Sequence, residues 1–198
     1  MAGLGSIANL GRIARIVALL LFLTPWMSVS CSSHGLDRLA DLGPSPISSG
    51  EVPIARASGL QLATGSVSYA DAAPLSSAMG EVSNLFDKPN PAVVGAALLI
   101  LLSLGASFFL KGVPGAMWGI AATGLAAAAL WYGVVVAIPG KADALFHRLG
   151  GNRMGVEIHA NVQIGFWLCL AALLAAVALD ALALRRTGRP AAASPPAT

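Results

Sequence analysis

The stretch AVVGAALLILLSLGASFFL, residues 92–110, decides the fold class, because it is long, apolar and free of charge. A helix needs about 20 such residues to cross a hydrocarbon core of roughly 30 Å. Residues 115–138 and 163–184 form two further windows of this kind. A fourth window, Ile13–Val29, is shorter and contains Pro25 near its outer end. The windows predict an all-α membrane protein, a four-transmembrane-helix bundle with a small extracytoplasmic loop domain that has room for short β-strands.

The overall composition agrees with a chain that lies largely in lipid. Hydrophobic residues make up 56% of the chain and charged residues only 11%, against about 25% charged residues in ordinary soluble domains. The net charge of +3 is modest, and no run of basic residues is longer than Arg185-Arg186. No aromatic platform is interleaved with basic residues, as nucleic-acid binding would require. We therefore expect a lipid bilayer as the main partner and no nucleic acid.

The positions of the basic residues predict the orientation. Lys and Arg near short loops mark the cytoplasmic side of a bacterial membrane protein. Four spans would place three basic segments on one side, and none of the three contains an acid; their basic residues are Arg12, Arg15, Lys111, Arg185, Arg186 and Arg189. The sequence thus predicts a multi-pass protein of the cell (inner) membrane with both termini in the cytoplasm.

The chain divides at the ends of the apolar windows. We expect a transmembrane signal-anchor helix, an extracytoplasmic segment, a transmembrane hairpin, an extracytoplasmic loop with a short amphipathic helix at 141–149, a transmembrane helix and a disordered cytoplasmic tail. These segments cover residues 1–30, 31–91, 92–138 (spans 92–110 and 115–138), 139–162, 163–184 and 185–198, respectively.

Short strands are expected in the two outer segments. Apolar and polar residues alternate around Leu60-Gln61-Leu62 and again over residues 66–69, with a turn signal at Thr64-Gly65, which predicts a β-hairpin. Residues 156–160 alternate in the same way and could pair with that hairpin. An alanine-rich helix is expected over residues 74–86.

The N-terminus admits three interpretations. Arg12 and Arg15, an apolar run and Ser28-Val29-Ser30 are typical of a secretory signal with a small-residue cleavage region. Cys31 follows directly, so the arrangement also resembles a lipobox in which Cys31 would be lipidated. Trp26 instead suits an interfacial anchor at the end of an uncleaved helix. An uncleaved first helix, lipoprotein processing and ordinary cleavage all stay open at this point.

Two motifs resemble a family of uncharacterised bacterial multi-pass membrane proteins. The first is Pro25-Trp26-Met27-Ser28-Val29-Ser30-Cys31, and the second is Ser58-Gly59-Leu60-Gln61-Leu62-Ala63-Thr64-Gly65. Gly165-Phe166-Trp167 is similar to that family as well, whereas the gap between Cys31 and Ser58 is longer here. The family carries no known activity. The resemblance implies an outer-domain motif in which Cys31 is structural; its residues are Cys31, Ser58, Gly59, Leu62 and Gly65.

Small residues in the third window predict close helix packing. Gly115 and Gly119 form a GxxxG pair, and Gly124 follows; small residues let helix backbones approach where lipid removes the hydrophobic drive for association. This face serves either packing within the bundle or contact with a membrane-protein partner or a second copy.

Asp180 is the only acid inside an apolar window. Acids within the membrane are functional candidates. We expect a structural role, however, because Asp180 lies about one turn from the cytoplasmic end of its window, where Arg185 and Arg186 are close enough to neutralise it. The alternative is a proton or ion relay. The sequence shows no second buried charge to which a proton could pass, which argues against a relay.

No residue set predicts a cofactor, a metal site or catalysis. His34, His147 and His159 are scattered, with Glu157 near the last of them, and we expect no metal ligation. Cys31 and Cys169 are more plausible as separate thiols than as a disulfide. No phosphate-binding loop, dinucleotide signature, nucleophile elbow or zinc-protease motif occurs, so we do not expect an enzyme.

The sequence therefore favours a non-catalytic accessory or scaffold component of a bacterial envelope complex. The alternatives are a small transporter or channel that uses Asp180 and Thr123, and a lipoprotein anchored through Cys31.

Overall fold

A computed structural model gives the fold, and it describes residues 2–33, 52–66, 68–69, 88–110, 112–141 and 156–187. The amphipathic helix expected at 141–149 and the helix expected at 74–86 lie outside the described residues, apart from Lys141. So do His34, His147 and the tail beyond Thr187.

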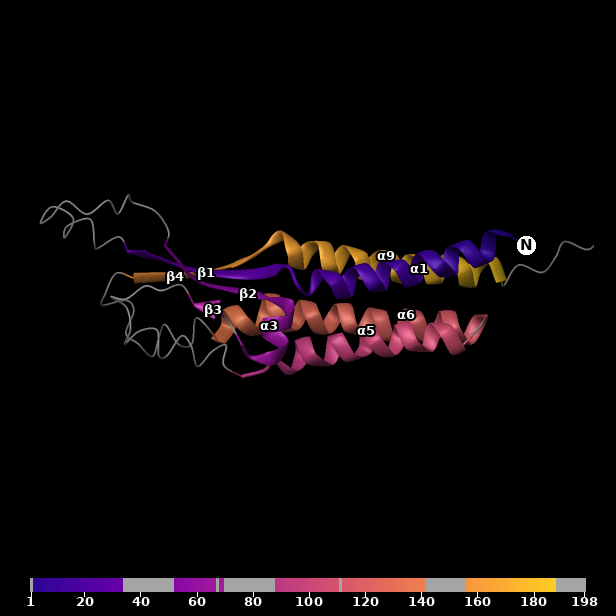
Figure 1. Ribbon diagram of the computed structural model, residues 1–198, viewed down its shortest axis with the longest axis horizontal. Helices are drawn as coiled ribbons and strands as arrows, with labels where there is room; N and C mark the ends of the chain where they lie inside the picture. The colour runs from indigo at the N-terminus through magenta and orange to yellow at the C-terminus, as the bar shows by residue number, and fades with distance from the viewer. Residues whose placement is uncertain are drawn as a thin grey trace, which may run out of the picture.

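Four long helices lie side by side and form the larger part of the molecule (Figure 1). They are α1 (Ala2–Leu21), α5 (Pro91–Phe109), α6 (Val113–Trp131) and α9 (Ile164–Thr187). A π-helix, η2 (Tyr132–Val136), follows α6 directly and helical structure continues to Lys141. Three helical segments in the described part of the chain are long and apolar enough to cross a membrane: Pro91–Phe109, Val113–Lys141 and Ile164–Arg186.

The ends of α5 follow from local chemistry. The Asn90 side chain accepts a hydrogen bond from Ala92 N, and Pro91 occupies the first turn. Proline is tolerated there because an N–H in the first turn would have no acceptor within the helix. At the other end, Gly112 has a φ of +75° in the turn that leads into α6, a conformation that only glycine adopts without strain.

The first helix differs from the expected one. Helix α1 ends at Leu21, and Pro25–Ser33 form strand β1, so the expectation of a helix over residues 1–30 is wrong from residue 22 onward. Pro25 has no N–H to donate within a helix. Trp26, which was expected as an interfacial anchor, is instead buried within the protein, as are Met27 and Val29 at the end of the same window.

A four-stranded antiparallel sheet extends from one end of the helices. Its other strands are β2 (Val52–Ser58), β3 (Ser68–Tyr69) and β4 (Val156–Val162), in the order β3-β2-β1-β4. The strand expected at 156–160 is confirmed, but it pairs with β1 and not with the expected hairpin. That hairpin is wrong: residues Gly59–Thr64 form helix α3, and β3 pairs with β2.

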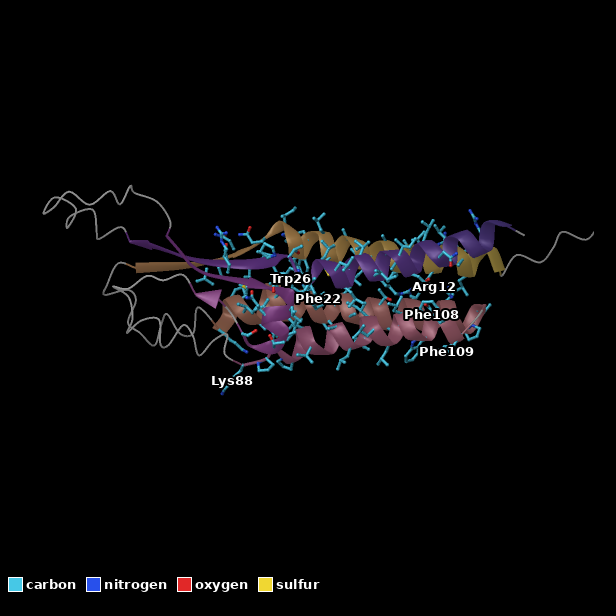
Figure 2. All side chains as sticks on the ribbon, viewed as in Figure 1. Arg12, Phe22, Trp26, Lys88, Phe108 and Phe109 are labelled. Carbon is cyan, nitrogen blue, oxygen red and sulfur yellow. The ribbon has the colours of Figure 1, made fainter. Side chains whose placement is uncertain are left out.

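Aromatic residues fill the junction between the helices and the sheet. The Trp26 ring is fully buried and packs on Phe22 and Phe166, with ring centroids 4.5 Å and 5.7 Å away. Its indole N–H donates to the Leu21 carbonyl at 2.8 Å. Figure 2 shows Trp26 and Phe22 at this junction, with Arg12 and Phe108 near the opposite end of the helices. The sheet is therefore fixed to the helices by a packed aromatic layer.

Candidate functional site

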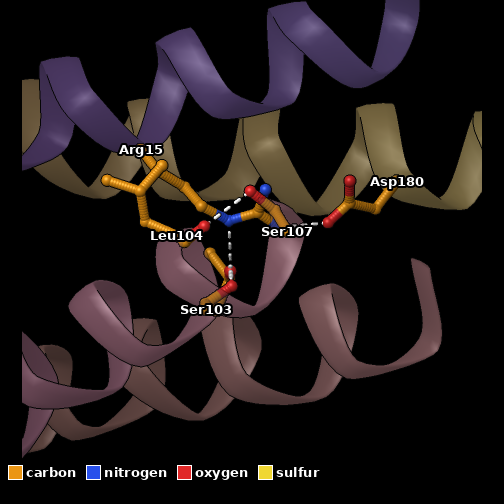
Figure 3. A network of polar contacts seen from close by, with 6 residues as sticks. Arg15, Ser103, Leu104, Ser107 and Asp180 are labelled. Atoms are coloured by element: carbon orange, nitrogen blue, oxygen red, sulfur yellow. Dashed lines mark hydrogen bonds and ion pairs between the residues drawn. The ribbon is translucent and has the colours of Figure 1, made fainter. Parts of the chain in front are cut away.

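A charged pair lies inside the bundle. Arg15 of α1 is only 2% exposed, and its guanidinium forms an ion pair with the carboxylate of Asp180 on α9, whose side chain is 13% exposed (Figure 3). A buried charge whose partner is removed costs about 3–5 kcal/mol. The carboxylate of Asp180 is in direct contact with Arg15, so the packing of α1 among the other helices depends on α9.

The Arg15 backbone lies well within the helical part of the molecule. Ala18, which is one turn further along α1, accepts a hydrogen bond at 3.5 Å from the thiol of Cys169. Cys169 is five residues into α9 from Ile164, or about 8 Å at 1.5 Å per residue. Arg15 therefore lies roughly 12 Å below the sheet end of the bundle, and its side chain reaches Asp180 nearer the other end.

Two hydroxyls extend the ion pair to the remaining helices. Arg15 Nε donates to Thr123 Oγ1 of α6 at 3.1 Å, and Thr123 Oγ1 lies 3.1 Å from Ser103 Oγ of α5. Thr123 and Ser103 are 0% and 1% exposed. One residue from each long helix is thus linked in what we call the four-helix polar network: Asp180, Arg15, Thr123 and Ser103. Figure 3 shows Arg15 between Asp180 and Ser103.

Two glycines make room for this network. A Cβ on Gly119 would lie 2.3 Å from Asp180 Oδ2 and 2.6 Å from Arg15 Nη2, closer than any real side chain tolerates. A Cβ on Gly11 would lie 3.2 Å from Asp180 Oδ1. Gly119 therefore leaves the space that the ion pair occupies where α6 faces it, and any larger residue there would make the pair move.

Arg12 binds the end of α5. Its guanidinium donates to the Ser107 carbonyl, stacks over the Phe108 ring at 4.7 Å and contacts Asn9 Oδ1 at 3.3 Å. The last carbonyls of a helix lack partners within it and carry partial negative charge. Arg12 thus stabilises the C-terminus of α5 from a neighbouring helix, a role that the sequence did not indicate.

The partner of Asp180 differs from the expected one. Arg185 and Arg186 were expected to neutralise it, but the ion pair is with Arg15, which is 165 positions away in sequence. The expectation that no second buried charge exists is wrong for the same reason. Arg15 counted only as a cytoplasmic marker because it is the third residue of the window Ile13–Val29, at the end expected in the cytoplasm. The missed signal was Asp180 itself: an acid within an apolar window needs a basic partner nearby, and Arg15 is the basic residue that lies inside another window.

The outer-domain motif forms a capped helical turn. Ser58 caps α3 and forms a capping box with Gln61, while Gly65 ends the helix with a φ of +73°. Leu62 is 3% exposed, and a Cβ on Gly59 would lie 2.7 Å from the Trp26 ring. These four motif residues therefore build α3 and seat it against the aromatic junction.

One asparagine connects α3, α5 and the π-helix. Asn90 N donates to Leu62 O at 2.9 Å, and Asn90 Nδ2 donates to Gly133 O at 3.1 Å. A π-helix shifts the backbone bonding pattern and tends to mark functional positions. A Cβ on Gly133 would lie 2.8 Å from Ala92 Cβ, so α6 and α5 approach closely at this point.

The other predicted residues are not part of the network. The Cβ of a residue replacing Gly115 would meet the Leu110 carbonyl at 2.3 Å, whereas Gly124 has nothing within 4 Å of its Cβ position. Cys31 lies in β1, opposite Val52 and Ile158. Cys169 is buried as a free thiol. Among the described residues, no group of three His, Cys, Asp or Glu side chains could hold a metal ion.

The chain matches no family model and no curated protein sequence. The role of the four-helix polar network must therefore be inferred from its geometry.

Proposed function

We propose that α1, α5, α6 and α9 all cross the bacterial inner membrane, with both chain termini in the cytoplasm. The start of α1, the α5–α6 turn and the end of α9 lie together at the end opposite the sheet (Figure 1). Arg185 and Arg186 are in the last turn of α9 at that end, as cytoplasmic placement requires. This proposal gives the fold a sheet domain on the outer side.

Exposed aromatic residues support the position of the outer boundary. Trp131 and Trp167 are 44% and 42% exposed, and their rings meet edge to face at 5.7 Å near the sheet end. Tryptophan collects at the membrane–water interface. Trp167 and Arg185 are separated by about 27 Å along α9 at 1.5 Å per residue, which is close to the thickness of a hydrocarbon core.

Within this placement, we propose a non-catalytic accessory or scaffold role in an envelope complex. The observation that carries it is the use of the buried polar groups: Arg15, Ser103 and Thr123 are the buried polar side chains of the described part, and all three bond within the network. Their hydrogen-bonding groups hold four helices together, which is a property of a rigid structural unit.

Gentle detergent extraction followed by native electrophoresis tests this role. The expected result is a species larger than the monomer that contains a partner protein or a second copy. Gly124→Leu should reduce that species, because Gly124 has open space around it on α6. Gly105→Leu is the matched control, since Gly105 is equally open but lies on α5. A monomer without any co-purifying partner would contradict the proposal.

We further propose that α1 stays attached. Cleavage before Cys31 would remove α1 with Arg15 and divide β1, the strand that pairs with both β2 and β4. The intact mass of the purified protein distinguishes the cases, because lipoprotein processing at Cys31 would remove the first 30 residues and add lipid. Membership of the bacterial family with the two outer motifs is part of the same proposal; Ser58, Gly59 and Gly65 of the second motif each have a structural role in this chain.

A transporter or channel is the second candidate, and the charged pair inside the bundle favours it. Reconstitution into vesicles and ion-flux measurements on wild type and Asp180→Asn test this candidate. Equal flux for both proteins, or no flux for either, would exclude a route through Asp180.

A further inference from the structure

The first helix has two possible positions in the membrane, and the sequence and the structure each select a different one. Hydropathy selects Ile13–Val29, which leaves Arg12 and Arg15 at the cytoplasmic boundary. The structure selects Ala2–Leu21, which places Arg15 in the bundle and residues from Pro25 onward in a strand. The outer boundary moves from Val29 to about Phe22, a displacement of roughly 10 Å at 1.5 Å per residue.

We propose that the N-terminal segment first inserts in the hydropathy-selected position and is drawn outward when β4 and α9 arrive. This proposal rests on the membrane placement of α1 given above. Before α9 is made, Arg15 has no acid to pair with, because Asp180 is the only acid within the described long helices. An unpaired arginine is then more stable at the cytoplasmic interface, where its side chain reaches water.

The late elements stabilise the assembled position at both ends of the segment. At the inner end, α9 provides Asp180 as the counter-charge for Arg15. At the outer end, β4 pairs with β1 from Met27↔Val162 to Ser33↔Val156 without interruption. The backbone groups of residues 25–29, which must be bonded wherever they lie, exchange helical bonds for ladder bonds.

The side chains that leave the lipid are also accommodated. Trp26, Met27 and Val29 are 0%, 1% and 4% exposed in the assembled protein. Trp26 packs against Phe166 of α9, and Gln163, next to the start of α9, donates from its backbone N to Trp26 O at 2.7 Å. The apolar residues at the outer end of Ile13–Val29 therefore gain a complete second apolar environment only when β4 and α9 have joined β2.

Leu23 reports the position of the segment. In the assembled protein it is 64% exposed and adjoins Thr24, whose Oγ1 would lie 2.3 Å from a Cβ on Gly165 in the first turn of α9. Leu23 is therefore at the outer boundary. In the hydropathy-selected position it would lie about 15 Å from Ile13 along the helix, near the middle of the bilayer.

The test is labelling of Leu23→Cys in intact, outer-membrane-permeabilised cells with a charged maleimide that does not cross the inner membrane. The full-length chain carries Cys31→Ser, so that the outer thiol of Cys31 does not contribute. The expected result is strong labelling with Asp180 present and loss of most of the label in Asp180→Leu. The matched control is Arg15→Leu with Asp180→Leu, in which no charge is left unpaired and labelling should return.

The outcomes separate the two proposals. Absence of labelling in the protein with Arg15 and Asp180 intact would contradict the membrane placement itself. Labelling of Asp180→Leu at the same level as that protein would overturn only the two-position proposal. Where Asp180→Leu does not accumulate, Asp180→Asn removes the charge with little change in volume, and labelling of Leu23→Cys is measured in that variant. Unchanged labelling would again overturn the two-position proposal.

Discussion

Replacement of Gly119 by alanine should damage the bundle far more than the same change at Gly124. The new Cβ at position 119 would lie 2.3 Å from Asp180 Oδ2, whereas non-bonded carbon and oxygen atoms rest more than about 3 Å apart. The ion pair must therefore move or separate. Because breaking a buried pair costs about 3–5 kcal/mol, a partial displacement of Arg15 and Asp180 should lower the free energy of unfolding by about 2–4 kcal/mol.

Gly124 provides the matched control on the same helix. Nothing lies within 4 Å of its Cβ position, so alanine there adds only helix propensity, which favours alanine over glycine by about 0.8–1.0 kcal/mol. For a domain of this size, each kcal/mol shifts Tm by about 2–4 °C. Thermal unfolding in a mild detergent should show Gly119→Ala lower than the parent by about 5–15 °C and Gly124→Ala equal or slightly higher.

A second comparison tests the mechanism of the loss. With Arg15 and Asp180 both replaced by leucine, the Gly119→Ala change meets no charged pair, so the two sets of changes should be strongly non-additive. Equal Tm values for Gly119→Ala and Gly124→Ala would refute the role assigned to Gly119. Full additivity would show that the alanine acts on something other than the ion pair.

The remaining predictions concern the junction with the sheet, and thermal unfolding measures all of them. Gly59→Ala should cost about 1–3 kcal/mol through overlap with the Trp26 ring, while Gly95→Ala, which meets nothing within 4 Å, should not destabilise; similar Tm values would contradict this. Gly65→Ala should cost about 1–2 kcal/mol, because residue 65 has a φ of +73°, and an unchanged Tm would be inconsistent with that cap. Asn90→Ala should cost about 1–2 kcal/mol by loss of the α5 cap, and more than Asn90→Asp, which keeps the accepting oxygen.

The sequence predicted the elements whose signal is local. Helices α5, α6 and α9 occupy the expected windows because each window is apolar over the length of a span and is bounded by Pro, Gly or Arg. The capped turn at Ser58–Gly65 was also predictable, although alternation of Leu60 and Leu62 favoured a strand. Ser58 with Gln61 three residues later is a capping box, and Gly65 is a helix stop; these signals outweigh three residues of alternation.

The elements that failed depend on distant partners. Hydropathy assigns Trp26, Met27 and Val29 to lipid because it counts apolar residues without asking what else could cover them. Their actual cover comes from β2, β4 and α9. Arg15 was assigned to water for the corresponding reason, since Asp180 lies 165 positions away. Both errors shift the predicted first helix toward the C-terminus of the segment. One places the outer apolar residues in lipid and the other places Arg15 in water, whereas all of them are covered by protein.

The strand ladder and the ion pair define the position of α1 jointly. Strand β1 continues α1, and β4 precedes α9 with only Gln163 between them, so a slip between β1 and β4 must also slide α1 along α9. A slip of one residue would turn every β1 side chain to the opposite face and expose Trp26 or Met27. A slip of two residues keeps the faces but moves the strand by about 6.6 Å, more than the 5.4 Å helical pitch of about 3.6 residues. After either slip, Arg15 and Asp180 would no longer lie side by side. Only one arrangement therefore satisfies the aromatic junction and the charged pair together.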